Sequence, residues 1–154
     1  MIVSADCFDG RLLRGYIYSR VLERGLPPST ADIGAHFGVC LETAKETLAR
    51  LKIGKTVLMH PRTGEILMAG PFAARETAYR VIGNTSGMRW FANCAWDMLG
   101  VAMIANEPVR IEAACTDCGA LMTLEVEPDS RPTDTSVVHF LVPARYWYDD
   151  IEFT

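Results

Sequence analysis

A cysteine and an aspartate that stand three residues apart are the part of the sequence best suited to chemistry. Cys94 and Asp97 lie in the run Asn93-Cys94-Ala95-Trp96-Asp97. On a helix, residues at this spacing share a face, so the side chains would lie within reach of each other. A thiolate is a preferred ligand of soft metals, and a carboxylate beside it can share its proton. The pair predicts a soft-metal ligand next to a proton carrier; the alternative is a small buried cysteine beside a capping aspartate.

A second motif, Cys115-Thr116-Asp117-Cys118-Gly119, has the C-x-x-C spacing of a zinc knuckle. It supplies only two ligands, so a zinc site would need Cys94 together with His139 or Asp97. Alternatively, Cys118 reaches Cys94 as a second thiolate, which gives the predicted metal-ligand set Cys94, Asp97 and Cys118. The third interpretation is a turn between two strands in which the cysteines are only small side chains.

The elements around these motifs predict a small mixed β-sheet core with a buried helix. The apolar run Trp90–Ala105 is long enough for that helix, with one face formed by Phe91, Ala95, Met98, Leu99 and Ala102. Strands are expected before and after it, at Tyr79–Ile82, Val109–Ala114, Leu121–Val126 and Val137–Val142.

The N-terminal part of the chain predicts helices at Asp9–Arg24, Ala31–Phe37 and Leu41–Leu51, followed by a hairpin of Val57–His60 and Ile66–Met68. Three helices before a hairpin are typical of a winged helix. We therefore expect an α+β protein with a winged-helix-like domain at residues 1–72 and a core domain at residues 73–154.

Composition narrows the function classes. The chain has 154 residues, of which 49% are hydrophobic, so it can bury a core. No apolar run reaches the roughly 18 residues of a membrane span, and the first residues lack a secretory signal, so we expect a cytoplasmic protein without a membrane partner. Its five cysteines are then expected to be reduced. The net charge of −4 and the absence of a clustered basic face argue against a nucleic-acid partner.

The segment from Arg89 to Leu99 resembles the aromatic-x-x-Cys-Ala-x-Asp-x-Leu segment of the organomercurial (alkylmercury) lyase family. The spacing to Cys115 and the order of the later strands are also similar. The resemblance implies cleavage of a carbon–mercury bond by protonolysis, with Cys94 as the first thiolate, Asp97 as the proton-handling carboxylate and Cys115 as a structural residue. It implies mercury as substrate and product ligand without a required cofactor, and external thiols and a mercuric reductase as partners.

The family's second catalytic cysteine should follow Pro143 by roughly a dozen residues, and the sequence reaches Thr154 without one. We therefore expect a core truncated at its C-terminus, and leave open whether this chain turns over. The explanations are a natural short form that binds without cleaving, a shortened chain, or a reading frame ended early, including at a UGA codon for selenocysteine. A rival function is a winged-helix transcription regulator with a metal- or ligand-sensing core.

Overall fold

The computed structural model describes residues 9–53, 56–115, 117–128, 137, 140, 142–147 and 149. The first three elements in this part of the chain are helices. Helix α1 (Gly10–Arg24) begins where the Asp9 carboxylate accepts a hydrogen bond from the Arg11 amide at 2.8 Å. A capping box of Ser29 and Asp32 starts α2 (Thr30–Phe37), and α3 (Leu41–Ile53) follows. The three predicted helices are confirmed.

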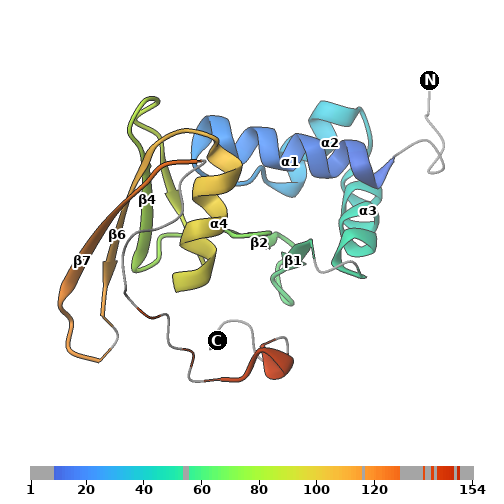
Figure 1. Cartoon of the computed structure of the whole chain (residues 1–154). Coiled ribbons are helices and arrows are strands. Elements are labelled where there is room, and N and C mark those ends of the chain that lie inside the picture. The colour runs from blue at the N-terminus through green and yellow to red at the C-terminus, as the bar shows by residue number, and fades with distance from the viewer. Residues whose placement is uncertain are drawn as a thin grey trace.

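The next element is a small antiparallel sheet of β1 (Val57–Met59), β2 (Ile66–Ala69) and β3 (Phe72–Ala73), shown with the helices in Figure 1. The predicted hairpin is confirmed by the pairing of β1 with β2. The assignment of this unit as a winged helix, on which the alternative function as a transcription regulator depends, stays a prediction. So does the domain boundary after residue 72, which falls within β3; there Phe72 also bridges to Ala92 of the following unit.

A four-stranded sheet forms the second unit, with strand order β5-β4-β6-β7. Its strands are β4 (Tyr79–Gly83), β5 (Arg89–Phe91), β6 (Val109–Ala114) and β7 (Leu121–Val126). The α+β fold is confirmed, but the described strands pair only in antiparallel fashion, so the expected mixed sheet is wrong for them. Short turns join β4 to β5 and β6 to β7, and such connections produce antiparallel pairs. The predicted strand Val137–Val142 lies mostly outside the described residues.

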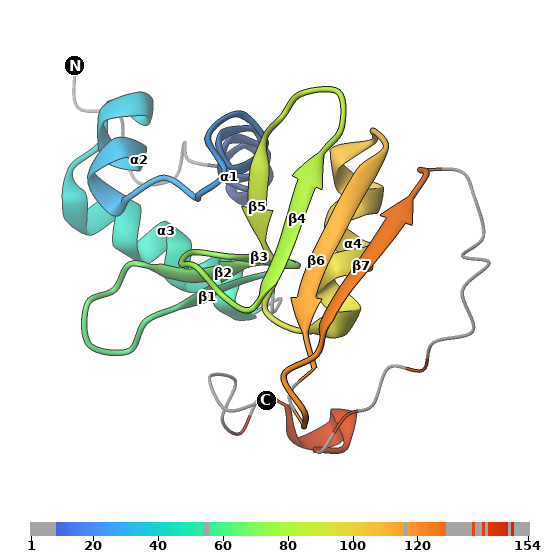
Figure 2. The same cartoon turned by 90° about the vertical axis from the view of Figure 1, so that its left-hand side faces the viewer.

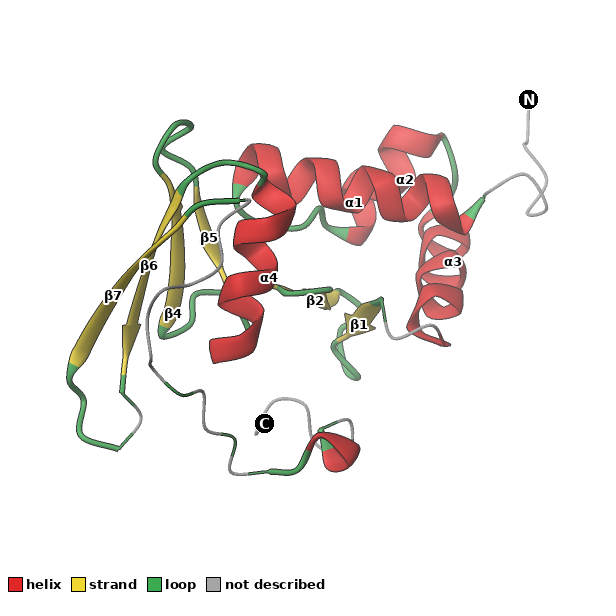
Figure 3. Ribbon diagram, in the orientation of Figure 1, coloured by secondary structure: helices red, strands yellow, loops and turns green. Residues whose placement is uncertain are grey.

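Helix α4 (Ala95–Ala105) covers one face of this sheet (Figures 2 and 3). The prediction of a helix from Trp90 onward is wrong at its start, because Arg89–Phe91 is strand β5 and Trp90 pairs with Val81 of β4. Buried Met98, Val101 and Ala102 of α4 belong to the same core as Val81 and the inward residues of β6. Helix α4 and the large sheet thus pack against each other through a shared apolar core.

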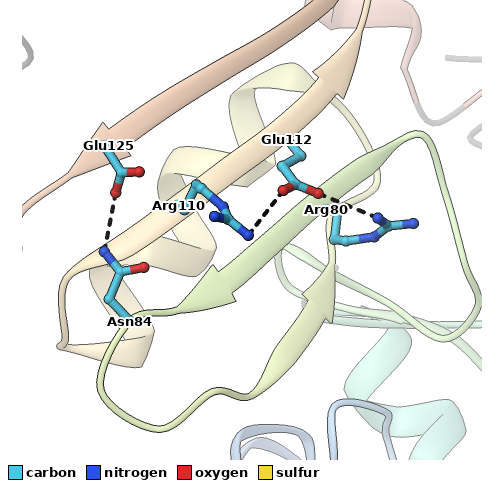
Figure 4. Close-up of polar contacts among 5 residues, drawn as sticks. All are labelled: Arg80, Asn84, Arg110, Glu112 and Glu125. Carbon is cyan, nitrogen blue, oxygen red and sulfur yellow. Dashed lines mark hydrogen bonds and ion pairs between the residues drawn. The ribbon is translucent and has the colours of Figure 1, made fainter.

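Alternation along β4 and β6 decides which side chains face α4. Val81 and its partner Ile111 are buried, whereas their neighbours Arg80, Arg110 and Glu112 lie on the opposite face. There Glu112 pairs with Arg80 at 3.3 Å and with Arg110 at 3.1 Å (Figure 4). Tyr79, two residues before Val81, therefore points to the α4 side of the sheet.

Trp90 ties the helical unit to the sheet. Its indole nitrogen donates a hydrogen bond to the carbonyl of Val21 in α1 at 3.0 Å, and the side chain is only 2% exposed. Gly25, which ends α1 with φ 83°, lies against the Arg89 carbonyl, and a Cβ there would come within 2.5 Å of that oxygen. Strand β5 is therefore held by two contacts with the C-terminal end of α1, just before the Cys94 motif.

Candidate active site

The topology of the large sheet brings the chemically capable residues to one end. Because β4 is antiparallel to both β5 and β6, those two strands run in the same direction. Cys94 follows the end of β5 and Cys115 follows the end of β6, while Tyr79 begins β4 between them. In Figures 1 and 2 the start of α4 and the β6–β7 turn lie toward the same end of the sheet.

Cys94 is the N-cap of α4, with an extended backbone at φ −148° and ψ 178°. Its side chain makes no capping hydrogen bond, but the amides of Asp97 and Trp96 face its sulfur. Burial raises the pKa of the Cys94 thiol, those amides lower it, and the negative charge of Asp97 raises it further, with a net increase. The surroundings of the partly buried thiol thus favour its protonated form.

Asp97 lies in the first turn of α4, and its carboxylate accepts hydrogen bonds from Asn93 and from the Cys94 thiol. Burial raises the pKa of Asp97, and the two hydrogen bonds only partly oppose that increase. Asn93 also donates from its side-chain nitrogen to the carbonyl of Gly70 at 3.3 Å. Asn93 thereby connects the β2–β3 turn to the Asp97 carboxylate.

Tyr79 lies near Cys94 and was not among the residues singled out from the sequence. The pKa of its phenol is raised by burial and by the nearby charge of Cys94. Its carbonyl accepts from the Ala92 amide at 2.9 Å, which holds the Cys94 segment against β4. The only sequence signal for Tyr79 was its place at the start of a strand, and the pairing that brings it to Cys94 is not local.

An apolar pocket of about 450 Å³ opens beside the first turn of α4. Trp96, which stands between Cys94 and Asp97, forms one wall and is 59% exposed. The other lining residues come from the C-terminal segment around the 3₁₀ helix Ala144–Tyr146, and they are Phe140, Val142, Pro143, Ala144 and Trp147. Trp147 is held by a hydrogen bond from its indole nitrogen to the Val142 carbonyl at 2.8 Å.

Of the predicted metal ligands, the structure brings Cys94 and Asp97 together. Cys118 is exposed in the β6–β7 turn, where it contacts Cys115. Among the residues that the structure describes, no group of three or more histidine, cysteine or acidic side chains is placed to hold a metal. The set Cys94, Asp97 and Cys118 therefore stays a prediction, and His139, offered as a zinc ligand, lies outside the described residues.

Over its described ranges the chain contains no helix with the length and apolar character needed to cross a membrane. A search of curated proteins found no match. One solved structure with a similar fold is described as the mercury-bound form of MerB2, with a TM-score of 0.58 and 17% sequence identity. The match covers 80% of this chain and 59% of that chain, and at this identity it shows the fold alone.

The sequence itself is matched by a family model. The model of the alkylmercury lyase family, MerB, matches residues 72–154, which is just over half of the chain and includes Cys94 and Asp97. The resemblance drawn from the segment around Cys94 is thereby confirmed. This chain belongs to the alkylmercury lyase family.

Proposed function

We propose that this chain binds an organomercurial, or another soft metal ion, through Cys94 and Asp97. It then cleaves the carbon–mercury bond by protonolysis when a second thiolate or selenolate completes the site. The observation that carries the proposal is the hydrogen-bonded, partly buried Cys94–Asp97 pair at the start of α4 in a member of the alkylmercury lyase family.

The chemistry follows from the proton that the pair shares. As the Cys94 sulfur bonds to mercury, its proton passes to the Asp97 carboxylate, which is already hydrogen bonded to the thiol. Electron density donated by sulfur moves onto the mercury-bound carbon, and Asp97 then delivers the proton to that carbon. The carbon–mercury bond breaks, the hydrocarbon leaves, and mercury remains on sulfur without a change in oxidation state.

A second soft ligand stabilises the mercury left behind. An external thiol can supply it in solution, and we also propose external thiols as the carriers that bring substrate and remove product. A mercuric reductase is a suitable acceptor for that product, and the cytoplasm is a suitable compartment because its thiols are kept reduced. Cys118 as a direct partner of Cys94 stays a prediction.

The apolar pocket beside Trp96 is suited to the organic group of the substrate. Its lining offers aromatic and aliphatic surface from Trp96, Phe140 and Trp147, and Trp96 lies between the two reacting residues in sequence. Apolar walls with a few polar groups at one end are typical of small-molecule sites. The pocket favours substrates with a bulky apolar group, such as a phenyl group, over those with a methyl group.

The proposal is tested by incubating the reduced protein with methylmercury and an excess of a monothiol, and measuring methane and inorganic mercury. We expect both products in equal amounts, and their loss in Cys94→Ser. The matched control is Cys40→Ser, since Cys40 is exposed just before α3 with its sulfur 3.3 Å from the Thr43 hydroxyl. Mercury binding without methane from the unaltered protein would reduce the function to binding alone.

A further inference from the structure

A pair of thiols, Cys115 and Cys118, lies in the turn between β6 and β7, apart from the Cys94–Asp97 pair. The turn is closed by two backbone hydrogen bonds, from the Cys115 amide to the Ala120 carbonyl at 2.8 Å and from the Gly119 amide to the Cys115 carbonyl at 2.9 Å. Gly119 has φ 72°, a conformation that glycine adopts without strain. This geometry folds Cys118 back toward Cys115.

The side chains of Cys115 and Cys118 interact. The Cys115 side chain is hydrogen bonded to the Cys118 side chain, and the amides of Asp117 and Cys118 also donate to the Cys115 sulfur. Such amides stabilise negative charge on sulfur, as they do in other turns that bind anions. Cys118 is exposed, so the pair can be reached from solvent.

We propose that Cys115 and Cys118 form a two-thiolate site for a soft metal ion. Binding a divalent ion exchanges the two thiol protons for one metal, with both protons released to solvent and no change in oxidation state. Two thiolates neutralise the charge of such an ion, and sulfur ligands select thiophilic metals. Structural zinc normally takes four ligands, and the described residues offer no larger group here. The site therefore suits an ion that is satisfied by two sulfurs.

Inorganic mercury, the product of the proposed cleavage, is the ion that this site would take; that identification rests on the proposed function. The C-terminal ends of β5 and β6 lie at the same end of the sheet, with only β4 between them. At the usual strand spacing, the two strand ends are roughly 10 Å apart. The Cys115–Cys118 pair is thus placed to accept the ion released near Cys94. Each transfer replaces one sulfur–mercury bond by another, and the proton of the incoming thiol moves to the departing thiolate.

The test uses mercuric chloride as the probe and removes Cys94 from the measurement. Reduced Cys94→Ser protein is mixed with mercuric chloride and an excess of glutathione, desalted, and analysed for bound mercury by mass spectrometry. Glutathione strips mercury from single thiols, whereas a paired site holds it by chelation. We expect Cys94→Ser to keep about one mercury ion per chain, and Cys94→Ser/Cys118→Ser to keep at most about a tenth as much.

Cys94→Ser/Cys40→Ser is the matched control and should keep as much mercury as Cys94→Ser. Unchanged thermal unfolding of the Cys118 variant shows that the turn still folds, and an excess of zinc should not displace the mercury. Equal retention with and without Cys118, or no retention by Cys94→Ser, overturns the inference. Failure of the proposed function appears separately, as the absence of methane from the unaltered protein.

Discussion

Replacing Asp97 with asparagine should abolish cleavage while sparing mercury binding. An asparagine oxygen can still accept the hydrogen bond from Asn93, so the first turn of α4 should keep its geometry. It cannot take the proton of the Cys94 thiol or deliver one to carbon. A positioned general acid or base contributes typically 10²- to 10⁴-fold, so methane release by Asp97→Asn should fall by about that factor. This corresponds to about 3–5 kcal/mol of transition-state stabilisation.

The assay is single-turnover methane release from methylmercury in excess thiol, followed by gas chromatography, with bound mercury measured in parallel. Stability separates a chemical from a structural effect. Because burial raises the pKa of Asp97, the folded protein binds that proton more tightly than the unfolded chain, and the ionised carboxylate lowers stability above its unfolded pKa. The Tm of Asp97→Asn at neutral pH should therefore be equal or higher. Methane release within a few-fold of the unaltered rate would refute the assigned proton transfer.

Three further substitutions test the surroundings of the pair. Asn93→Ala removes a hydrogen bond that lowers the pKa of Asp97, so the limb of the pH–rate profile that rises as Asp97 ionises should move to higher pH. Trp90→Phe removes the buried bond to the Val21 carbonyl and part of the packed ring, and should lower the free energy of unfolding by roughly 2–3 kcal/mol in urea denaturation. Trp96→Ala should reduce kcat/KM for phenylmercury relative to methylmercury by roughly 2- to 12-fold, the equivalent of one aromatic contact.

Local patterns were sufficient for the N-terminal helices and the β1–β2 hairpin. Apolar spacing, the Ser29 cap and the glycine after α1 are all local signals, and the structure follows them. The same reasoning failed at Trp90. An unbroken apolar run fits a buried helix and a buried strand equally, and the choice was made by the pairing of Trp90 with Val81 and its hydrogen bond to α1.

In the candidate site, too, the local contacts could be predicted from the sequence and the contacts between distant segments could not. The spacing of Cys94 and Asp97 predicted their contact, because three residues at a helix start bring two side chains together whatever the rest of the fold does. Tyr79 and the Gly70 carbonyl come from β4 and the β2–β3 turn, and only the assembled sheets bring them to the pair. The contact of Cys118 with Cys115 depends on the turn geometry, which the C-x-x-C spacing alone left open.

The most direct measurement of the central claim is the isotopic composition of the hydrocarbon released in heavy water. The protons of the Cys94 thiol and of Asp97 exchange with solvent, so protonolysis of methylmercury in D₂O should give methane that carries a single deuterium. The singly deuterated product should appear with the unaltered protein and excess thiol, and be lost with Cys94→Ser. Methane without deuterium, or bound methylmercury that releases no hydrocarbon at all, would contradict proton delivery to the mercury-bound carbon by this pair.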